Sequence, residues 1–537
     1  MKNSVLRQTR TDLPPAGPGR FLVLSDRLPI HLTRCPREGL KVAPARGALI
    51  SALAPVLRER GGVWIGWPGV AEEEVPGLRK VLAGGIHPGS LTGGGAGGGA
   101  GGGYSLRPVS LTERDLRGGY HGFGREVIWP LFHGQPLDGG FDPAYWQAYR
   151  RVNRKYARTV AGTVARSGGA ADFVWVHNHL LIHTAAELRR LGVPSRTGFF
   201  LHVPFPSPDL FLQLPWRRRL MAALLAYDQI GFQTRRDLAN FLDCARELTP
   251  GALVHPGPQG VWTVRAETPE GLVTLRAGAF PVGVDYRGFA SRAASPEVEA
   301  RLATLRTTLR GRRMVLGVDH LDRAQGIPEK LRAFAQVLES RPGLAGQVTL
   351  VQVLVPAREG LPGQAALRAE IERRVGEING RFSRAGWVPV CYYHRVLEPD
   401  DLVAHYRAAD AAFLTPLREG MNLVAKEYCA ADLDERGVLV LSEFAGAAAQ
   451  LGGTLGALKV NPFDVRTTAR TLVRALEMGE EERRARMRNL RREVRRHDVH
   501  AWAGSFLAAA LGTHGPALEG LDEESAPAAH SGLQSYN

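Results

Sequence analysis

Two glutamates with the spacing E-x7-E, Glu419 and Glu427, lie where the chain changes from a strand pattern to a helix pattern. The apolar run from Ala411 to Leu414 predicts a buried parallel strand, Gly420 predicts a turn, and helical spacing follows Asn422, a suitable N-cap. Such a strand, turn and helix aim free backbone N–H groups at one point, as in the phosphate sites of α/β folds. One carboxylate would then lie near a sugar and the other near a ribose. On spacing alone, an ordinary strand-to-helix turn with a solvated glutamate is the favoured interpretation.

Other short apolar runs also end in residues that can bind a ligand. Phe21 to Leu24 leads to Arg27, Phe173 to His177 leads to Asn178, and a further run ends at His202. Open α/β sheets bind ligands at the carboxyl ends of their strands, so these three positions are candidates. Taken singly, Arg27 is better explained as a surface arginine, and a lone histidine is usually structural.

Length and composition limit the class of protein. A chain of 537 residues favours two large domains, and 44% hydrophobic with 23% charged residues is ordinary for a soluble α/β protein. No apolar run reaches the roughly 18 residues of a membrane span, and the N-terminus lacks the apolar core of a secretory signal, so we expect a cytoplasmic protein. The four cysteines lack C-x-x-C spacing, which argues against a zinc site or a disulfide framework.

The formal net charge of +15 raises the alternative of a nucleic-acid binder. Much of the excess is arginine, gathered around residues 217–219 and 483–496. In the second stretch the arginines recur at helical spacing beside glutamates, which favours a solvated helix face. No recognisable nucleic-acid module accompanies them, and a basic cleft that collects phosphorylated sugars would use the same charge.

The literal sequence around the two glutamates, T-P-L-R-E-G-M-N-L-V-A-K-E-Y, resembles the nucleotide-sugar motif of the trehalose-6-phosphate synthase family. The resemblance covers roughly residues 20 to 511 and implies an α/β protein of the GT-B type, with two Rossmann-like domains facing across a cleft. It divides the chain into an acceptor-binding domain (20–283), a nucleotide-sugar-binding domain (284–467) and C-terminal helices that cross back to the first domain (468–511). Composition predicts a flexible tail (1–19), a disordered Gly/Ala insertion (91–103) and a disordered tail (512–537).

The resemblance also implies roles for individual residues. It implies catalytic roles at His202, His320, Gln325 and Glu419. It implies donor binding by Gly47, His320, Gln325, Arg358, Leu423, Val424, Ala425, Lys426 and Glu427. It implies acceptor binding by Arg27, Trp67, Tyr120, Trp129 and Asn178.

Four ligand-facing positions depart from the family pattern. Arg46 replaces a glycine and Asn178 an aspartate, while His320 and Gln325 replace the arginine and lysine that clamp the donor diphosphate. Charge could still come from Arg323, Lys330 or Arg358. It could also come from a protonated His320, which would make the enzyme most active on the acidic side, near or below pH ~6.5.

The function that the resemblance implies is retaining transfer of glucose from a nucleoside diphosphate glucose, most simply UDP-glucose, to glucose 6-phosphate. The product would be trehalose 6-phosphate, and neither a metal nor another cofactor is expected. The alternatives are a weakened or inactive homologue that binds sugar ligands or a partner in a regulatory role, and a transferase with another acceptor such as glycerol 3-phosphate. The expected partners are a nucleotide sugar and a phosphorylated sugar, without nucleic acid or membrane, in a possible homo-oligomer.

Overall fold

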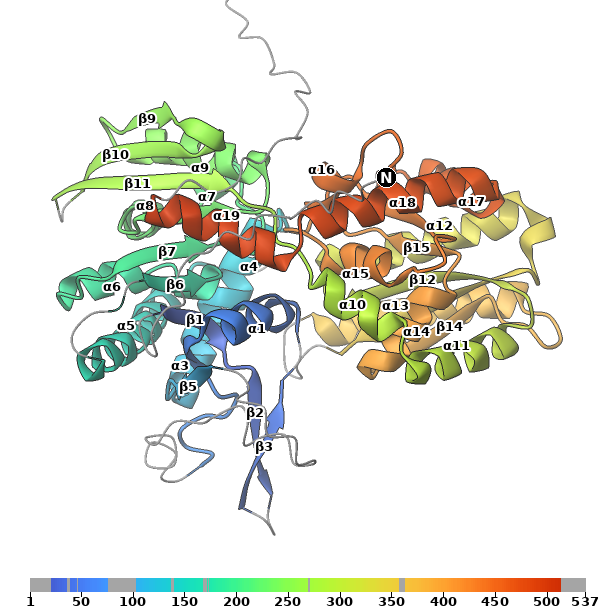
Figure 1. Cartoon of the computed structure of the whole chain (residues 1–537), viewed down its shortest axis with the longest axis horizontal. Coiled ribbons are helices and arrows are strands. Elements are labelled where there is room, and N and C mark those ends of the chain that lie inside the picture. The colour runs from blue at the N-terminus through green and yellow to red at the C-terminus, as the bar shows by residue number, and fades with distance from the viewer. Residues whose placement is uncertain are drawn as a thin grey trace, which may run out of the picture.

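Two α/β domains lie side by side in the computed structural model, the first on the left and the second on the right of Figure 1. The structure describes residues 21–35, 39–45, 47–75, 103–136, 140–167, 171, 173–268, 271–356 and 363–512. The predicted tails and the Gly/Ala tract lie outside the described residues except for Gly103 and Gly512, and so do Arg46 and Arg358.

The first domain is built on a sheet of the order β5-β4-β1-β6-β7-β8-β11-β10-β9. Neighbouring strands from β5 to β11 pair in parallel, while β10 pairs antiparallel with β11 and β9. A separate antiparallel hairpin, β2 with β3, projects at the bottom of Figure 1. The strands are β1 (Phe21–Arg27), β2 (Ile30–Cys35), β3 (Gly39–Pro44), β4 (Gly62–Trp67), β5 (Tyr104–Pro108), β6 (Phe173–His177), β7 (Arg196–Phe200), β8 (Gln229–Phe232), β9 (Leu253–Pro256), β10 (Trp262–Thr268) and β11 (Gly271–Ala279).

Helices cover both faces of this sheet (Figure 1). The longest described one, α5, begins where the Asp142 carboxylate accepts the N–H of Ala144, and it buries Trp146, Tyr149 and Tyr156 along one face. The helical segments are α1 (Ala48–Arg60), α3 (Glu113–Asp115), the π-helix η2 (Leu116–Ile128), α4 (Trp129–Phe132), α5 (Pro143–Arg166), η3 (His179–Leu181), α6 (Thr184–Arg190), α7 (Pro208–Phe211), α8 (Arg217–Leu225), α9 (Arg235–Leu248) and η4 (Pro258–Gly260).

The second domain is a parallel sheet of the order β14-β13-β12-β15-β16-β17, flanked by helices. Its central strands are buried on both faces, which explains their continuous apolar runs. The strands are β12 (Arg313–His320), β13 (Val348–Val355), β14 (Val390–His394), β15 (Ala411–Leu414), β16 (Val438–Ser442) and β17 (Leu458–Val460). Its helices are α10 (Tyr286–Ala293), α11 (Pro296–Leu309), η5 (Arg323–Gln325), α12 (Ile327–Ser340), η6 (Pro342–Leu344), α13 (Gln364–Phe382), α14 (Pro399–Ala408), α15 (Leu423–Ala431), α16 (Ala447–Leu451), α17 (Val465–Glu477) and α18 (Glu480–Arg496), and the last described helix, α19 (Val499–Leu511), lies outside this domain. None of the helices described is long and apolar enough to pass through a bilayer.

The C-terminal helix α19 crosses back to the first domain, as the resemblance implied (Figure 1). Trp502 packs on Trp175 and Phe200 with ring centroids 5.1 and 5.0 Å apart, and Phe506 stacks on Trp175 at 4.9 Å. The predicted range of the helices that cross back, residues 468–511, was too wide. Helices α17 and α18 pack on α12, α15 and β16 of the second domain, because their buried side chains complete its apolar core.

The chain therefore passes between the domains twice, and the two passages touch. The N–H of Val499 donates to the carbonyl of Val284 at 3.0 Å. A Cβ at Gly283 would lie 2.3 Å from the carbonyl carbon of Asp498, so only glycine allows this approach. The close contact fixes where the two passages cross.

We expect Gly283→Ala to destabilise the protein, because the added methyl group would push the two passages apart. Overpacking of this kind typically costs about 1–3 kcal/mol. Thermal unfolding of the variant should show a lower Tm than the wild type. Gly479→Ala is the matched control, since a Cβ there meets nothing within 4 Å, and an equal loss in both variants would contradict the prediction.

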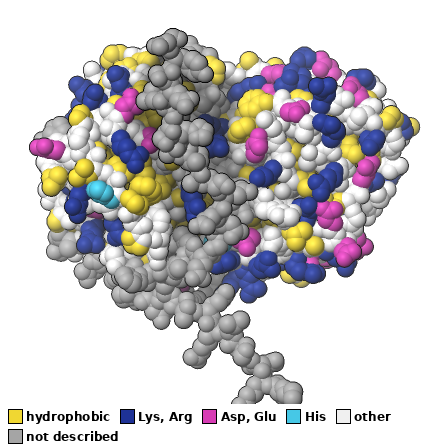
Figure 2. All heavy atoms as spheres, turned by 90° about the horizontal axis from the view of Figure 1, so that it is seen from above, with side chains coloured by type: hydrophobic (Ala, Val, Ile, Leu, Met, Phe, Trp, Pro, Cys, Tyr) yellow, Lys and Arg dark blue, Asp and Glu magenta, His cyan; other side chains and the backbone are white. Residues whose placement is uncertain are grey.

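The arginines of α18 are largely engaged in pairing and capping. Arg484 and Arg488 pair with Glu480 and Glu435 at 2.6 and 2.9 Å, and Arg491 donates to three carbonyls at the end of α15, those of Cys429, Ala430 and Asp432. Figure 2 shows basic and acidic side chains interspersed over the second domain. This pattern fits the predicted solvated helix face better than a surface that follows a nucleic acid.

Candidate functional site

The N-terminus of α15 is built by Asn422, which has a left-handed backbone (φ 77°). Its side-chain oxygen accepts the N–H of Ala425 at 2.9 Å, and its amide donates to Glu419 at 2.7 Å. The N–H groups of Leu423 and Val424 in the first turn have no intrahelical acceptor. Since Arg491 holds the opposite end of the helix, α15 presents its positive end as a site for an anion.

Glu419 lies on the turn before α15, half-buried and held by two amides. Asn422 and Gln325 both donate to its carboxylate. Burial, together with the negative charges of Asp319 and Asp322, raises the pKa of Glu419 to about 7. The carboxylate is thus poised to change charge near neutral pH, and the neutral Gln325 does not oppose that shift with a cation.

The neighbouring side chains Glu427 and Lys426 contact different parts of the protein. Tyr406 donates to the Glu427 carboxylate at 2.8 Å, and burial raises the pKa of Glu427. The Lys426 ammonium is buried and donates to the carbonyl of Val282, at 2.6 Å, and to Gln450. Burial lowers the pKa of Lys426 to about 7. The Lys426 side chain therefore ties α15 to the passage between the domains, and only its backbone belongs to the helix N-terminus.

We predict that Glu427→Ala abolishes measurable binding of UDP, because the resemblance implies that this carboxylate holds the donor ribose beside the helix start. Calorimetric titration with UDP measures the loss. Glu435→Ala is the control, because Glu435 lies after α15 and pairs with Arg488 instead. Unchanged UDP affinity in Glu427→Ala would move the nucleotide site away from α15.

At the diphosphate clamp expected at β12, the described residues His320 and Gln325 provide no permanent cation. His320 is the last residue of β12 and is exposed there, and desolvation by the surrounding protein is the main cause that lowers its pKa. Arg323 and Lys330 cannot replace the missing charge, because Arg323 forms two 2.9 Å bonds with Glu329 and Lys330 is fully buried against Asp319. The suggestion that these two side chains lend charge was wrong, since each is already neutralised by a carboxylate.

The first domain contributes Arg27 between two aromatic rings. The Arg27 guanidinium carbon lies 4.6 Å from the ring centre of Trp67 and 5.6 Å from that of Tyr120. Arg27 Nε and Nη2 are buried without a hydrogen-bond partner among the described residues, and so is Trp129 Nε1. Buried donors of this kind are rare unless a ligand completes them, so the group favours an oxygen-rich anion.

Asn178 follows β6 with an unusual left-handed backbone (φ 72°). Its side-chain oxygen accepts the N–H of His179 at 3.0 Å, so the oxygen serves the local turn. The amide nitrogen is the group that Asn178 can direct at a ligand. This differs from an aspartate, which would offer a carboxylate oxygen.

His202 lies after β7, where the two domains meet. Its Nε2 is 3.0 Å from Nδ1 of His177, and burial lowers the pKa of His202 to about 3, so the imidazole is neutral. A Cβ at Gly420 would lie 2.0 Å from the carbonyl oxygen of His202. Gly420 therefore lets the turn of the second domain touch the first, which brings His202 and Glu419 to the same cleft. A Cβ at Gly47, which precedes α1, would meet no described atom within 4 Å.

The geometry agrees with the comparison to protein families. The model described as Glycosyltransferase family 20 matches residues 19–511. The chain belongs to glycosyltransferase family 20. A trehalose-6-phosphate synthase of Mycolicibacterium smegmatis is 38% identical over 522 residues, covering 97% of this chain and 98% of that protein. One from Mycobacterium bovis is 39% identical over 499 residues, covering 93% and 96%.

Solved structures of the same family have the same GT-B fold. An α,α-trehalose-phosphate synthase (UDP-forming) from Burkholderia xenovorans, in complex with glucose-6-phosphate, has a TM-score of 0.77 and 34% identity and covers 92% of this chain and 100% of that chain. A structure from E. coli bound with UDP-2-fluoro glucose has a TM-score of 0.76 and 32% identity, covering 92% and 99%. The predicted family and fold are confirmed.

One cleft residue of this family 20 chain was missed by sequence reasoning. Arg125 lies in η2, with its guanidinium carbon 4.7 Å from the ring centre of Trp129. Its positive charge helps to lower the pKa values of His121, His179 and His320, after burial. Arg125 thus acts on groups from both domains. Its only sequence signal was a basic residue between two aromatic segments, and the π-helical spacing hid its direction.

Proposed function

We propose that the protein transfers glucose from UDP-glucose to glucose 6-phosphate with retention, and so forms trehalose 6-phosphate. The observation that carries the proposal is the pairing of two anion-binding surfaces across one cleft. The α15 N-terminus with Glu427 belongs to the second domain, and Arg27 with its unpartnered donors belongs to the first. Gly420 brings the turn before α15 against His202 of the first domain. A transfer between a nucleotide sugar and a phosphorylated sugar needs these two surfaces.

In this proposal the donor is bound by the second domain. Glu427 holds the ribose, and the N–H groups of Leu423 and Val424 bind the diphosphate at the positive end of α15. Glu419, kept in place by Gln325 and Asn422, accepts hydrogen bonds from the hydroxyl groups of glucose. His202 contributes a neutral imidazole on the other side of the sugar.

The acceptor is bound by the first domain. Arg27 takes its phosphate, Trp67 and Tyr120 surround that guanidinium, and Trp129 and Asn178 donate to oxygens of the sugar. The leaving diphosphate takes the acceptor proton on the same face of the donor sugar, so that no protein nucleophile is required. Negative charge develops on the leaving group, and preorganised donors and cations lower the barrier by stabilising it.

Arg125 supplies the cation that His320 and Gln325 do not. It faces the cleft from the first domain, and its charge is felt at His320 of the second. Because arginine stays protonated, this source of charge does not depend on pH. Among the described residues, Arg125 therefore keeps a permanent charge available for the leaving group, contributed from the opposite domain.

The proposal is tested by incubating the purified protein with UDP-glucose, ADP-glucose or GDP-glucose and with glucose 6-phosphate or glycerol 3-phosphate. Sugar product and released nucleoside diphosphate are both measured. We expect trehalose 6-phosphate and UDP in equal amounts, and an anomeric assay should show retention at the transferred glucose. Release of UDP without a sugar product, or no turnover with any pair, would contradict the proposal.

The proposed chemistry uses no metal, because backbone N–H groups and Arg125 carry the charge of the diphosphate. We expect EDTA at millimolar concentration to leave the rate unchanged, within experimental error. Adding back Mg²⁺ should then have no effect. A rate that falls with EDTA and returns with Mg²⁺ would show that a cation takes part.

A further inference from the structure

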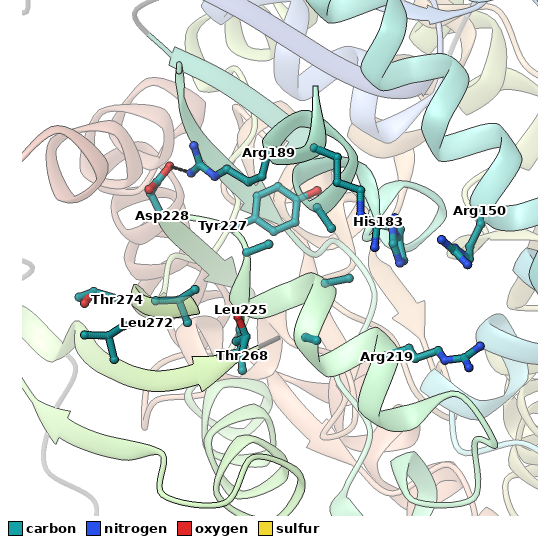
Figure 3. A pocket seen from close by; sticks show the side chains of 16 residues that line it. Arg150, His183, Arg189, Arg219, Leu225, Tyr227, Asp228, Thr268, Leu272 and Thr274 are labelled. Atoms are coloured by element: carbon teal, nitrogen blue, oxygen red, sulfur yellow. Dashed lines mark hydrogen bonds and ion pairs between the residues drawn. The ribbon is translucent and has the colours of Figure 1, made fainter. Parts of the chain in front are cut away.

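A pocket of about 520 Å³ opens in the first domain at the end of the sheet opposite to the cleft (Figure 3). Asp228, which lines it, precedes β8, and Leu272 to Thr274 lie at the start of β11, whereas His202 follows the carboxyl end of β7. We call this the arginine pocket, because its lining includes Arg150, Arg189, Arg190 and Arg219. Its volume is that of a small-molecule site.

Positive charge in and around the arginine pocket exceeds negative charge. The buried carboxylate of Glu187 is shared by Arg150, Arg154 and Arg190 at 4.0, 3.3 and 3.3 Å. Arg189 pairs with Asp228 at 2.7 Å across one side of the pocket (Figure 3). Three guanidinium groups around one carboxylate leave an excess of cations that an anion would neutralise.

Two buried nitrogens at one end of the pocket lack hydrogen bonds, although His183 Nδ1 lies 3.9 Å from the Glu187 carboxylate. Arg150 Nε and His183 Nδ1 are buried without a hydrogen-bond partner among the described residues, and the His183 residue is only 5% exposed. Figure 3 shows these two side chains next to each other, with Arg219 extending from α8 on the same side. After burial, the charges of neighbouring arginines lower the pKa of Arg150 further. A buried guanidinium nitrogen without an acceptor, beside like charges and one carboxylate shared by three arginines, is costly, and a bound anion would relieve that cost.

The opposite end of the pocket has a different character. Thr268 and Thr274 bring hydroxyl groups there, Asp228 brings a carboxylate, and Leu272 is 80% exposed. A carboxylate and hydroxyls suit the hydroxyl groups of a ligand and disfavour a second phosphate. The pocket therefore has one end for an anion and one end for a polyhydroxylated body.

We propose that the arginine pocket binds a small sugar phosphate, at a second site separate from the cleft. Its phosphate lies against Arg150, His183 and Arg219, and its hydroxyl groups face Asp228 and the two threonines. An inorganic phosphate ion alone would leave most of the pocket unfilled. The proposal does not depend on which reaction the cleft performs.

The test is calorimetric titration of the full chain with glucose 6-phosphate, with ribose 5-phosphate and inorganic phosphate as further probes. We expect two binding events per chain for at least one sugar phosphate. Arg27→Ala should remove the event in the cleft and keep the event in the pocket. Arg150→Gln combined with Arg219→Gln should weaken the pocket event about tenfold or more, because two charged hydrogen bonds are lost, and should keep the event in the cleft.

The matched control is Arg265→Gln with Arg466→Gln, which removes the same charge from two exposed positions and should keep both events. Circular dichroism and Tm verify that each variant is folded. A single event in the wild type that Arg27→Ala abolishes would overturn the proposal, and so would unchanged affinities in the pocket variant. If only the pocket event is seen, the proposed function of the cleft fails while the second site stands.

Discussion

Replacing Arg125 with alanine should lower kcat by about 10²–10³-fold, the usual loss when one preorganised stabilising group is removed from a transition state. Arg125 is the described cation whose charge reaches His320, the position where the family pattern has an arginine. Arg323 and Lys330, two further basic side chains described in that region, are paired with Glu329 and Asp319. The site therefore depends on Arg125 more than a site with a complete clamp would.

The measurement is steady-state kinetics with UDP-glucose and glucose 6-phosphate. Arg117→Ala is the control, because Arg117 is an exposed arginine of the same helix η2. Arg125→Lys keeps the charge but loses the planar stacking on Trp129, so it should recover part of the rate. A loss confined to KM for glucose 6-phosphate would mean that Arg125 serves the acceptor phosphate instead. A normal rate in Arg125→Ala would remove the residue from the mechanism.

The central motif could be predicted because local chemistry decides it. Asn422 caps α15, which begins at Leu423, and the apolar run from Ala411 to Leu414 is β15, as the pattern predicted. The GT-B fold followed from the resemblance of long segments. The cap and the strand depend on backbone geometry within a few residues, and sequence spacing records that geometry directly.

Features that depend on contacts between distant segments could not be predicted. Helical spacing puts Lys426 next to Glu427, but only the folded chain shows that its ammonium reaches Val282. Spacing also could not tell which C-terminal helix packs on the first domain, because α18 and α19 both bury apolar side chains. Arg125 was hidden for a further reason, since a π-helix turns its side chains in directions that a period of 3.6 does not give.

The pH dependence expected from the sequence also changes once the site is seen. A protonated His320 would favour activity on the acidic side, but desolvation lowers the pKa of His320 in the free site, which opposes that protonation. The group that titrates near neutrality is Glu419, whose pKa is raised to about 7 by burial. A carboxyl group loses its charge as the pH falls through its pKa. If ionised Glu419 holds the donor glucose, activity should therefore fall as the pH drops below about 7.

Gln325→Lys should shift this fall in activity, the acidic limb of the pH profile, to lower pH by a unit or more. The Gln325 amide already donates to Glu419, so a lysine at this position would place an ammonium group beside the carboxylate. A nearby cation favours the ionised form and typically lowers the pKa of a carboxyl group by about 1–3 units. The variant should consequently keep its rate at pH 6, where the wild type has lost most of its own, and the two rates should converge above pH 8.

The measurement is kcat/KM for UDP-glucose between pH 5 and 9. Gln347→Lys is the matched control, because Gln347 is exposed just before β13, at the amino end of that strand and away from the cleft, and should leave the profile unchanged. Glu419→Gln adds a second arm, since it removes the titrating group and should abolish the acidic limb together with most of the rate. A wild-type rate that rises below pH 7 would instead assign the pH dependence to His320. The negative charge of a bound diphosphate would then favour protonated His320 enough to outweigh the loss of charge at Glu419.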